Sequence, residues 1–67
     1  MEFKDRLKEL RILNNLSQMQ LSLKTGLSQS AIAKWELGKT EPDLLTLWKI
    51  ADFFDVSVDY LLGRKDV

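Results

Sequence analysis

One short segment, residues 28–39, carries side chains suited to specific contacts with a large ligand. If Ser28 begins a helix, successive side chains turn by about 100° and produce two different faces. The inward face is apolar and consists of Ala31, Ile32 and Trp35. The outward face combines an amide, a hydroxyl, a methyl group and an amine with no carboxylate, in Gln29, Ser30, Ala33, Lys34 and Leu37. Such a face offers hydrogen-bond donors, acceptors and apolar contacts, which is the chemistry of recognition.

The composition argues against several other classes of function. The 67 residues contain no histidine and no cysteine, which removes the usual general base, the thiolate nucleophile and the commonest metal ligands. With no phosphate-binding loop and no paired carboxylates in a plausible cleft, we expect no enzymatic activity, cofactor, metal or small-molecule ligand. The apolar runs are short and interrupted by charge, so we expect no membrane span and no signal peptide, and a cytoplasmic protein.

The net charge is zero, but it is unevenly distributed along the chain. Residues 1–40 contain seven Lys or Arg against four Asp or Glu, whereas residues 41–67 contain three against six. This asymmetry says more about partners than the total does, so zero net charge does not argue against nucleic acid as a partner. The alternative is that the asymmetry is scatter in a small sample.

The chain is predicted to be helical throughout, because it has one proline and no sustained two-residue alternation of apolar residues. Apolar residues at helical spacing define the first helix (Phe3, Leu7, Leu10 and Leu13), which ends at Asn14-Asn15 because asparagine tolerates the left-handed conformation. In all we expect five helices, at roughly 2–14, 17–25, 28–37, 43–55 and 58–62, in one domain over residues 1–67.

A recurring pattern marks the helix starts. Three times, an apolar residue and a serine precede another apolar residue, which predicts serine N-caps with hydrophobic staples at Ser17, Ser28 and Ser57. Gln20 completes a capping box with Ser17. Asp43, after the only proline, is expected to cap the fourth helix, whose core stripe is predicted to be Leu44, Leu47, Ile50, Ala51 and Phe54. Gly63 is expected to end the last helix.

The connection between the second and third helices is the most informative feature. Only Gly26 and Leu27 separate the expected end of one helix from the cap of the next. A turn this tight requires a residue with positive φ, which glycine adopts without strain. The arrangement predicts a helix-turn-helix over about residues 17–37. Its second helix, ~15 Å long, fits a major groove ~12 Å wide, so we expect the outward face to contact base edges.

From about Leu10 to Gly63 the chain resembles the lambda-repressor-like, or Cro/C1-type (XRE family), helix-turn-helix proteins. The matching stretches are LSQMQLSLKTGLSQSAIAKWELGKTEP and FFDVSVDYLLGR. They combine the glycine-centred turn, the serine caps, Trp-Glu-x-Gly-Lys and the Val-Ser-Val-Asp-x-Leu-Leu ending. The resemblance implies an all-α, compact five-helix bundle. It also implies a transcriptional regulator of repressor type that binds double-stranded DNA as a homodimer on a two-fold symmetric operator.

The resemblance also assigns roles to individual residues. Side chains of the third helix are expected to contact bases: Gln29, Ser30, Ala33 and Lys34. An amide can bond adenine bidentately, an amine suits guanine, and a methyl group suits the thymine methyl. Residues at the start of the second helix and on either side of the third are expected to contact phosphates: Ser17, Gln18, Ser28, Lys39 and Thr40. An ion pair between Arg11 and Glu36 is expected to hold the third helix to the first.

The sequence departs from the family pattern at four positions. Ser22 replaces the usual alanine, which is of similar size. Thr25 stands where an apolar residue is common, so we expect poorer packing at the end of the second helix. Leu37 replaces a common asparagine that contacts phosphate, and Glu41 places a negative charge in a loop that is often basic. The last two departures should weaken nonspecific DNA affinity.

Alternatives remain open at this stage. The polar residues of the outward face could be ordinary solvated surface, and Gln18 could serve only the helix start. Three apolar residues of the fourth helix, Leu45, Trp48 and Phe53, could be partly exposed groups or a dimer interface, which could also lie along the last helix. A helix-turn-helix acting through protein contacts, such as an antitoxin or an antagonist of another regulator, is the alternative function. The carboxylate-free face argues against that as the sole role.

Overall fold

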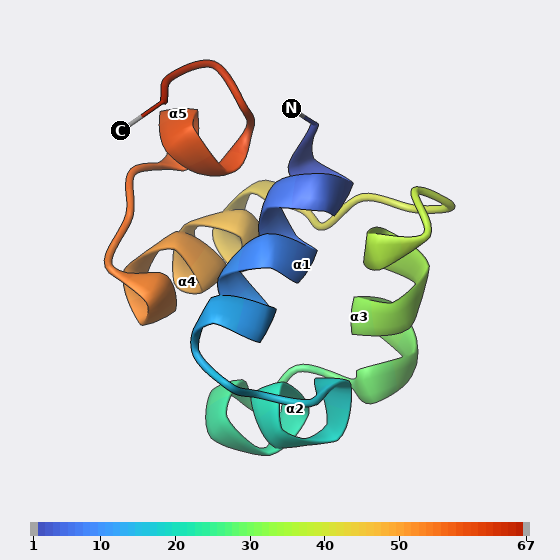
Figure 1. Ribbon diagram of the computed structural model, residues 1–67. Helices are drawn as coiled ribbons and strands as arrows, with labels where there is room; N and C mark the ends of the chain where they lie inside the picture. The colour runs from blue at the N-terminus through green and yellow to red at the C-terminus, as the bar shows by residue number, and fades with distance from the viewer. Residues whose placement is uncertain (1, 67) are drawn as a thin grey trace.

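The computed structural model describes residues 2–66 and contains five α-helices, with no strand among these residues (Figure 1). They are α1 Phe3–Leu13, α2 Gln18–Thr25, α3 Gln29–Glu36, α4 Leu44–Phe54 and α5 Val58–Leu61. Each helix lies inside its predicted range, and the all-α prediction is confirmed. None of the helices in the described part is long and apolar enough to cross a membrane.

Four of the helices start at the predicted caps. The side chains of Ser17, Ser28, Asp43 and Ser57 each accept a hydrogen bond from the backbone amide three residues later, over 2.8–3.0 Å. The capping box is also formed, because the amide of Ser17 donates to Oε1 of Gln20 at 2.8 Å. These bonds satisfy amides that have no partner inside the helix, so each start is determined by local chemistry.

The helix ends follow from residues in the left-handed conformation. Asn15 follows α1 with φ 57°, and Gly26 ends α2 with φ 77°. Asp55 at the end of α4 also has a positive φ, a position that the sequence analysis did not foresee. Aspartate tolerates this region better than most residues because its short polar side chain can bond locally.

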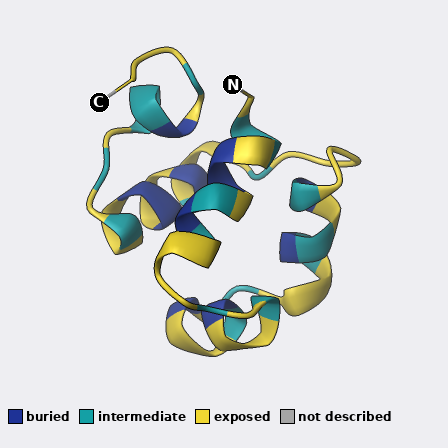
Figure 2. Ribbon diagram, in the orientation of Figure 1, coloured by how far each residue is buried: buried dark blue, intermediate teal, exposed yellow. Residues whose placement is uncertain are grey.

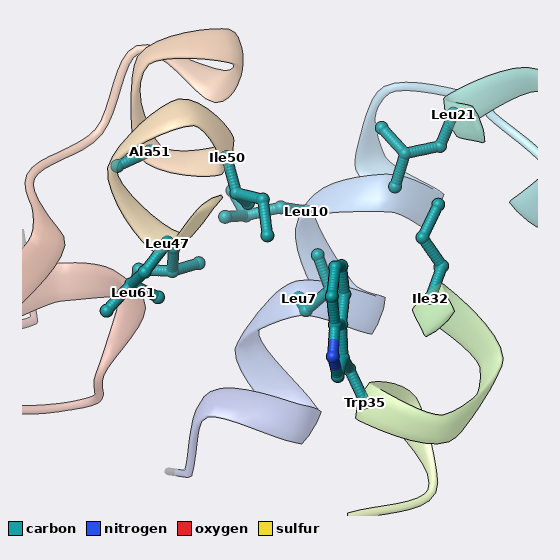
Figure 3. Close-up of a cluster of buried hydrophobic side chains, with 9 residues drawn as sticks. All are labelled: Leu7, Leu10, Leu21, Ile32, Trp35, Leu47, Ile50, Ala51 and Leu61. Carbon is teal, nitrogen blue, oxygen red and sulfur yellow. The ribbon is translucent and has the colours of Figure 1, made fainter. Parts of the chain in front are cut away.

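The hydrophobic core has α1 at its centre (Figure 3). Leu7 and Leu10 of α1 lie between two groups of buried side chains: Leu21, Ile32 and Trp35 from α2 and α3, and Leu47, Ile50, Ala51 and Leu61 from α4 and α5. Burial follows one stripe of each helix, with exposed residues on the outer sides of α2 and α3 (Figure 2). The helix-turn-helix is therefore packed against the rest of the chain through α1.

Arg6 joins α1 to the C-terminal part of the chain. Its guanidinium is buried and lies over the ring of Tyr60, with Cζ 4.0 Å from the ring centroid. The same group approaches the carbonyl oxygen of Lys65 at 3.5 Å, at the limit of a hydrogen bond. A cation stacked on an aromatic ring in a shielded position stabilises the docking of the short α5.

One expectation about packing is wrong. Leu44 was predicted in the core stripe of α4, but 71% of its surface is exposed. Leu13, at the same spacing as the buried residues of α1, is also largely exposed. Periodicity gives the direction in which a side chain points, not how far along the helix its neighbours extend. Both residues lie in a terminal turn of their helix.

Thr25 also differs from expectation, since its hydroxyl does not loosen the end of α2. The residue is buried, and its Oγ1 donates to the carbonyl of Leu21 at 2.7 Å. The same oxygen accepts from the amide of Leu27 at 3.2 Å. A buried hydroxyl with both bonds made carries no desolvation penalty of the kind an unpaired group would.

The cap of α4 should make stability depend on pH. Hydrogen bonding by Thr46, through its side chain and its backbone amide, lowers the pKa of Asp43. Because the folded-state pKa is below the unfolded-state value of about 3.9, the stabilisation is present above that value. It is lost as the pH falls through the folded-state pKa. Asp43→Asn keeps an acceptor that does not titrate. We therefore expect the variant's free energy of unfolding, measured with urea, to fall less on acidification than that of the unmodified chain. Parallel pH profiles would contradict this.

Candidate nucleic-acid interface

The turn between α2 and α3 is held by hydrogen bonds from side chains on α2. In addition to the bonds of Thr25, Oγ of Ser22 donates to the carbonyl of Leu27. Gly26 supplies the positive φ, as the spacing predicted. The serine that replaces the usual alanine thus forms a bond across the turn. Two polar contacts, from Ser22 and Thr25 of α2 to the backbone of Leu27, hold the turn in addition to packing.

The two faces of α3 are as different as the sequence predicted. Ile32 is 0% exposed and Trp35 7%, both on the side of the core, while Ala31 is half-buried. On the outward side, Gln29, Ser30 and Lys34 are exposed and Ala33 is half-buried. The structure therefore brings the four residues expected to contact bases onto one accessible surface. We call this surface, together with Leu37, the outward face.

The loop after α3 is shaped by Gly38. With φ 75°, Gly38 donates its amide to the carbonyl of Trp35 at 3.1 Å, and Lys39 donates to the carbonyl of Lys34 at 3.0 Å. This is a Schellman arrangement, in which the chain reverses directly after the helix. It brings Lys39 and Thr40, both exposed, to the end of the outward face.

Lys4 lies against this loop, a position that the sequence analysis did not assign. A Cβ built on Gly38 would lie 3.0 Å from Cδ of Lys4, so the lysine stem passes close to the loop and would be crowded by a side chain at position 38. Both residues line a hollow of about 400 Å³ whose wall includes Phe3, Trp35 and Lys39. No pattern in the sequence could reveal this contact, because it joins the first turn of α1 to a loop more than 30 residues away.

At the start of α2, the structure shows which backbone amides are still available for the predicted phosphate contacts. The amide of Ser17 already donates to Gln20, so a phosphate would have to use the amides of Gln18 and Met19 in the first turn. The side chain of Gln18 donates from Nε2 to Oε1 of Glu36 at 3.1 Å. A side-chain amide carries a second N–H, which remains available to a ligand.

Arg11 and Glu36 form a bidentate ion pair. Nε of Arg11 donates to one carboxylate oxygen of Glu36 at 2.7 Å, and a terminal nitrogen donates to the other at 2.9 Å. The side chains are only 13% and 5% exposed, respectively. The other terminal nitrogen donates to the carbonyl of Leu16 at 2.8 Å. The hydrogen bond and charge of Glu36 raise the pKa of Arg11 against the opposing effect of burial.

This pair determines the electrostatics of α3. Glu36 is the only acidic residue between Ser17 and Lys39. Its carboxylate accepts from Arg11 and Gln18 and is nearly excluded from water. Lys34 thus remains as the charged side chain of the outward face, and the loop that follows carries the exposed Lys39 together with the exposed Glu41. Such an arrangement can attract a polyanion while offering uncharged groups to it.

Comparison with known proteins gives concordant results. A family model described as "Helix-turn-helix" matches residues 7–61. The chain is 42% identical over its full length to the HTH-type transcriptional activator BcrR of Enterococcus faecalis, of which it covers 33%. It is 43% identical to the uncharacterized HTH-type transcriptional regulator MJ0272 of Methanocaldococcus jannaschii, covering 94% of this chain and 96% of that protein.

A solved structure with the same fold is that of the P22 c2 repressor protein in complex with a synthetic operator. It superposes with a TM-score of 0.88 at 29% sequence identity, covering 97% of this chain and 98% of that one. The chain spans about half the length, or less, of most of the curated relatives it matches. The similarity therefore concerns the helix-turn-helix region that these proteins share.

The ion pair provides a test of how α3 is held. Removing one partner of a buried pair costs about 3–5 kcal/mol, so with partly shielded partners we expect Arg11→Met to lower the free energy of unfolding by about 3 kcal/mol. Glu36→Gln should cost less, because Arg11 keeps its bond to the carbonyl of Leu16. The double variant should lose less than the two single losses combined, with a coupling of about 1–3 kcal/mol.

Urea unfolding of the three variants measures this coupling. Lys8→Met, which removes an exposed charge from the same helix, is the matched control and should stay within about 0.5 kcal/mol. Strictly additive losses would mean that the pair contributes nothing as a pair.

Proposed function

Because the chain belongs to the Cro/C1-type helix-turn-helix family of lambda-repressor-like proteins, we propose that it is a sequence-specific DNA-binding transcriptional regulator of repressor type. In this proposal α3 enters the major groove of an operator with two-fold symmetry, and two chains bind together. The protein acts in the cytoplasm and by occupancy of DNA, without a catalytic step or a cofactor. The operator complex of the similar P22 c2 repressor supports the mode of binding.

The observation that carries the proposal is the outward face of α3. It is accessible, includes no carboxylate, and is followed by Lys39 two residues after Leu37. A solvated helix surface without function would be expected to carry charges of both signs, as α1 does with Asp5, Lys8 and Glu9. A face of amide, hydroxyl, methyl and amine groups matches the donors, acceptors and methyl groups that base pairs present in the major groove.

Each residue of the face has a distinct proposed task. The exposed amide of Gln29, in the first turn of α3, can donate to and accept from the edge of an adenine. Lys34 can donate to the acceptors of a guanine, Ser30 can bond either, and Ala33 can contact a thymine methyl. Because these groups stand on one turn and a half of a regular helix, they face consecutive base pairs.

The phosphate contacts are proposed on both sides of this face. Gln18 is held by Glu36 with one N–H to spare, beside the free amides of the first turn of α2. Ser28 accepts a bond from the amide of Ala31, but its own O–H remains able to donate to a phosphate. Lys39 and Thr40 lie at the opposite end. The ion pair of Arg11 fixes the distance between the two ends, which sets the register on the duplex.

Two chains are needed because a single one has little electrostatic affinity. Attraction to phosphates supplies most nonspecific binding, and the chain carries no net charge. Two half-sites one helical turn, ~34 Å, apart would combine the affinities of two α3 helices. The described residues span 27 × 23 × 19 Å, so two copies can lie side by side with their α3 helices at that spacing. Exposed apolar residues of α4, namely Leu44, Leu45 and Trp48, support self-association.

Replacing Gln29 tests the base contacts. Gln29→Ala should reduce discrimination at one base pair of each half-site by about 1–3 kcal/mol, because a bidentate partner is lost. The residue is exposed, so the free energy of unfolding should change by less than about 0.5 kcal/mol. The preferred site is first selected from random DNA, and affinities for this site and for each single-base variant are then measured at two salt concentrations.

Lys39→Ala is the matched control and should behave differently. It should weaken binding to all sequences alike and reduce the slope of log affinity against log salt by about one. If Gln29→Ala weakened every sequence equally, the assignment of base contact would be wrong. If neither variant changed binding to any DNA, the proposal would give way to a module that acts through protein contacts.

The number of chains on DNA is a separate prediction. Sedimentation of the protein at micromolar concentration with a duplex carrying both half-sites should give two chains per duplex. A duplex with one half-site destroyed should bind much more weakly, because the second α3 loses its base contacts. A stable complex of one chain with full affinity would contradict the dimer.

A further inference from the structure

Leu37 is an exposed apolar side chain at the C-terminal end of the outward face. It caps α3, and 65% of its surface is accessible. Its amide donates to the carbonyl of Ala33 at 3.1 Å, and its backbone has φ −86° and ψ −8°. Helical geometry therefore continues through Leu37, so its direction follows from the rotation of the helix.

That direction lies in the middle of the outward face. At about 100° per residue, Leu37 stands about 40° from Ala33 and about 20° from Ser30 around the helix axis. The buried Ile32 and Trp35 lie on the other side. Side chains in helices lean toward the N-terminus, so Leu37 extends over the turn that contains Ala33. The two residues form an apolar strip between the polar groups of Gln29 and Lys34.

We propose that Leu37, together with Ala33, forms an apolar contact site for the C5-methyl group of a thymine in the major groove. The inference rests on the proposed function and assigns a specificity-determining role to a residue that departs from the family pattern. Leucine can neither donate to nor accept from a base or a phosphate. The apolar group that the major groove presents is the thymine methyl.

The spacing of the strip defines which bases are involved. Leu37 lies about 6 Å along the helix axis from Ala33, which is close to two base-pair steps of ~3.4 Å. The methyl group that contacts Leu37 is therefore expected within two base pairs of the one that contacts Ala33. Removal of one methyl group from an apolar contact should weaken binding about fourfold per half-site, from the transfer of a single methyl group out of water.

The test replaces single thymines of the selected operator by deoxyuridine, which removes the methyl group and keeps the base pairing. With the unmodified protein, one or two thymines per half-site should show the fourfold loss. With Leu37→Asn, the ratio of the affinities for the thymine and deoxyuridine operators at the position facing Leu37 should fall to about one. A phosphate contact by the new asparagine would change both affinities alike and leave this ratio unaffected. Leu23→Asn, at a leucine of α2 that is 77% exposed, is the matched control and should keep the full sensitivity.

The outcomes separate this inference from the proposed function. If no thymine shows sensitivity, or if Leu37→Asn keeps the full fourfold ratio between the thymine and deoxyuridine operators, Leu37 does not contact a methyl group and the inference is overturned. If the unmodified protein selects no DNA sequence at all, the proposed function fails first. Thermal unfolding confirms that the variant is folded, and Leu37→Ala, which keeps helix propensity, repeats the test should the asparagine variant unfold.

Discussion

The carboxylate of Glu36, almost excluded from water, constrains the whole surface proposed to face DNA. A charge at that depth must be paired, because leaving it alone costs several kcal/mol. Its partners come from two other helices: Arg11 from α1 and Gln18 from α2. Arg11 also holds the carbonyl of Leu16, in the loop between those helices. One polar cluster thus determines how the end of α3 lies relative to the start of α2.

The same cluster separates stability from recognition. Glu36, the acidic residue of α3, is paired with Arg11 in the interior, so the outward face has only neutral and basic groups. Core packing of Ile32 and Trp35 against α1 supports the helix from behind. Exposed residues of the outward face contribute little to the free energy of unfolding. They can therefore be replaced, with a change in the DNA contacts, at little cost in stability. A small chain without net charge then depends on directed contacts and on a second copy rather than on general attraction to phosphates.

Because both of its ends are fixed, the short helix α3 is suited to the proposed contacts with DNA. α3 has eight residues, too few to be stable by itself in water. The cap at Ser28 fixes its first turn, and Gly38 reverses the chain after Leu37 through two hydrogen bonds. Lys4 passes close to the loop at Gly38, so the position of Lys39 depends on α1 as well. The proposed contacts to bases and to phosphates are therefore placed by the body of the protein.

The sequence by itself determined the helices, because caps and left-handed residues act within a few positions. Ser17, Ser28 and Asp43 start helices through their own oxygens, and Gly26 permits the turn that identifies the fold. It also determined which side of α3 faces outward, since that depends only on helical rotation. Tertiary structure decided the burial of terminal turns, as the exposure of Leu44 shows. It alone decided the partners of Gln18 and Lys4, since each contact depends on where a folded neighbour lies, which periodicity does not specify.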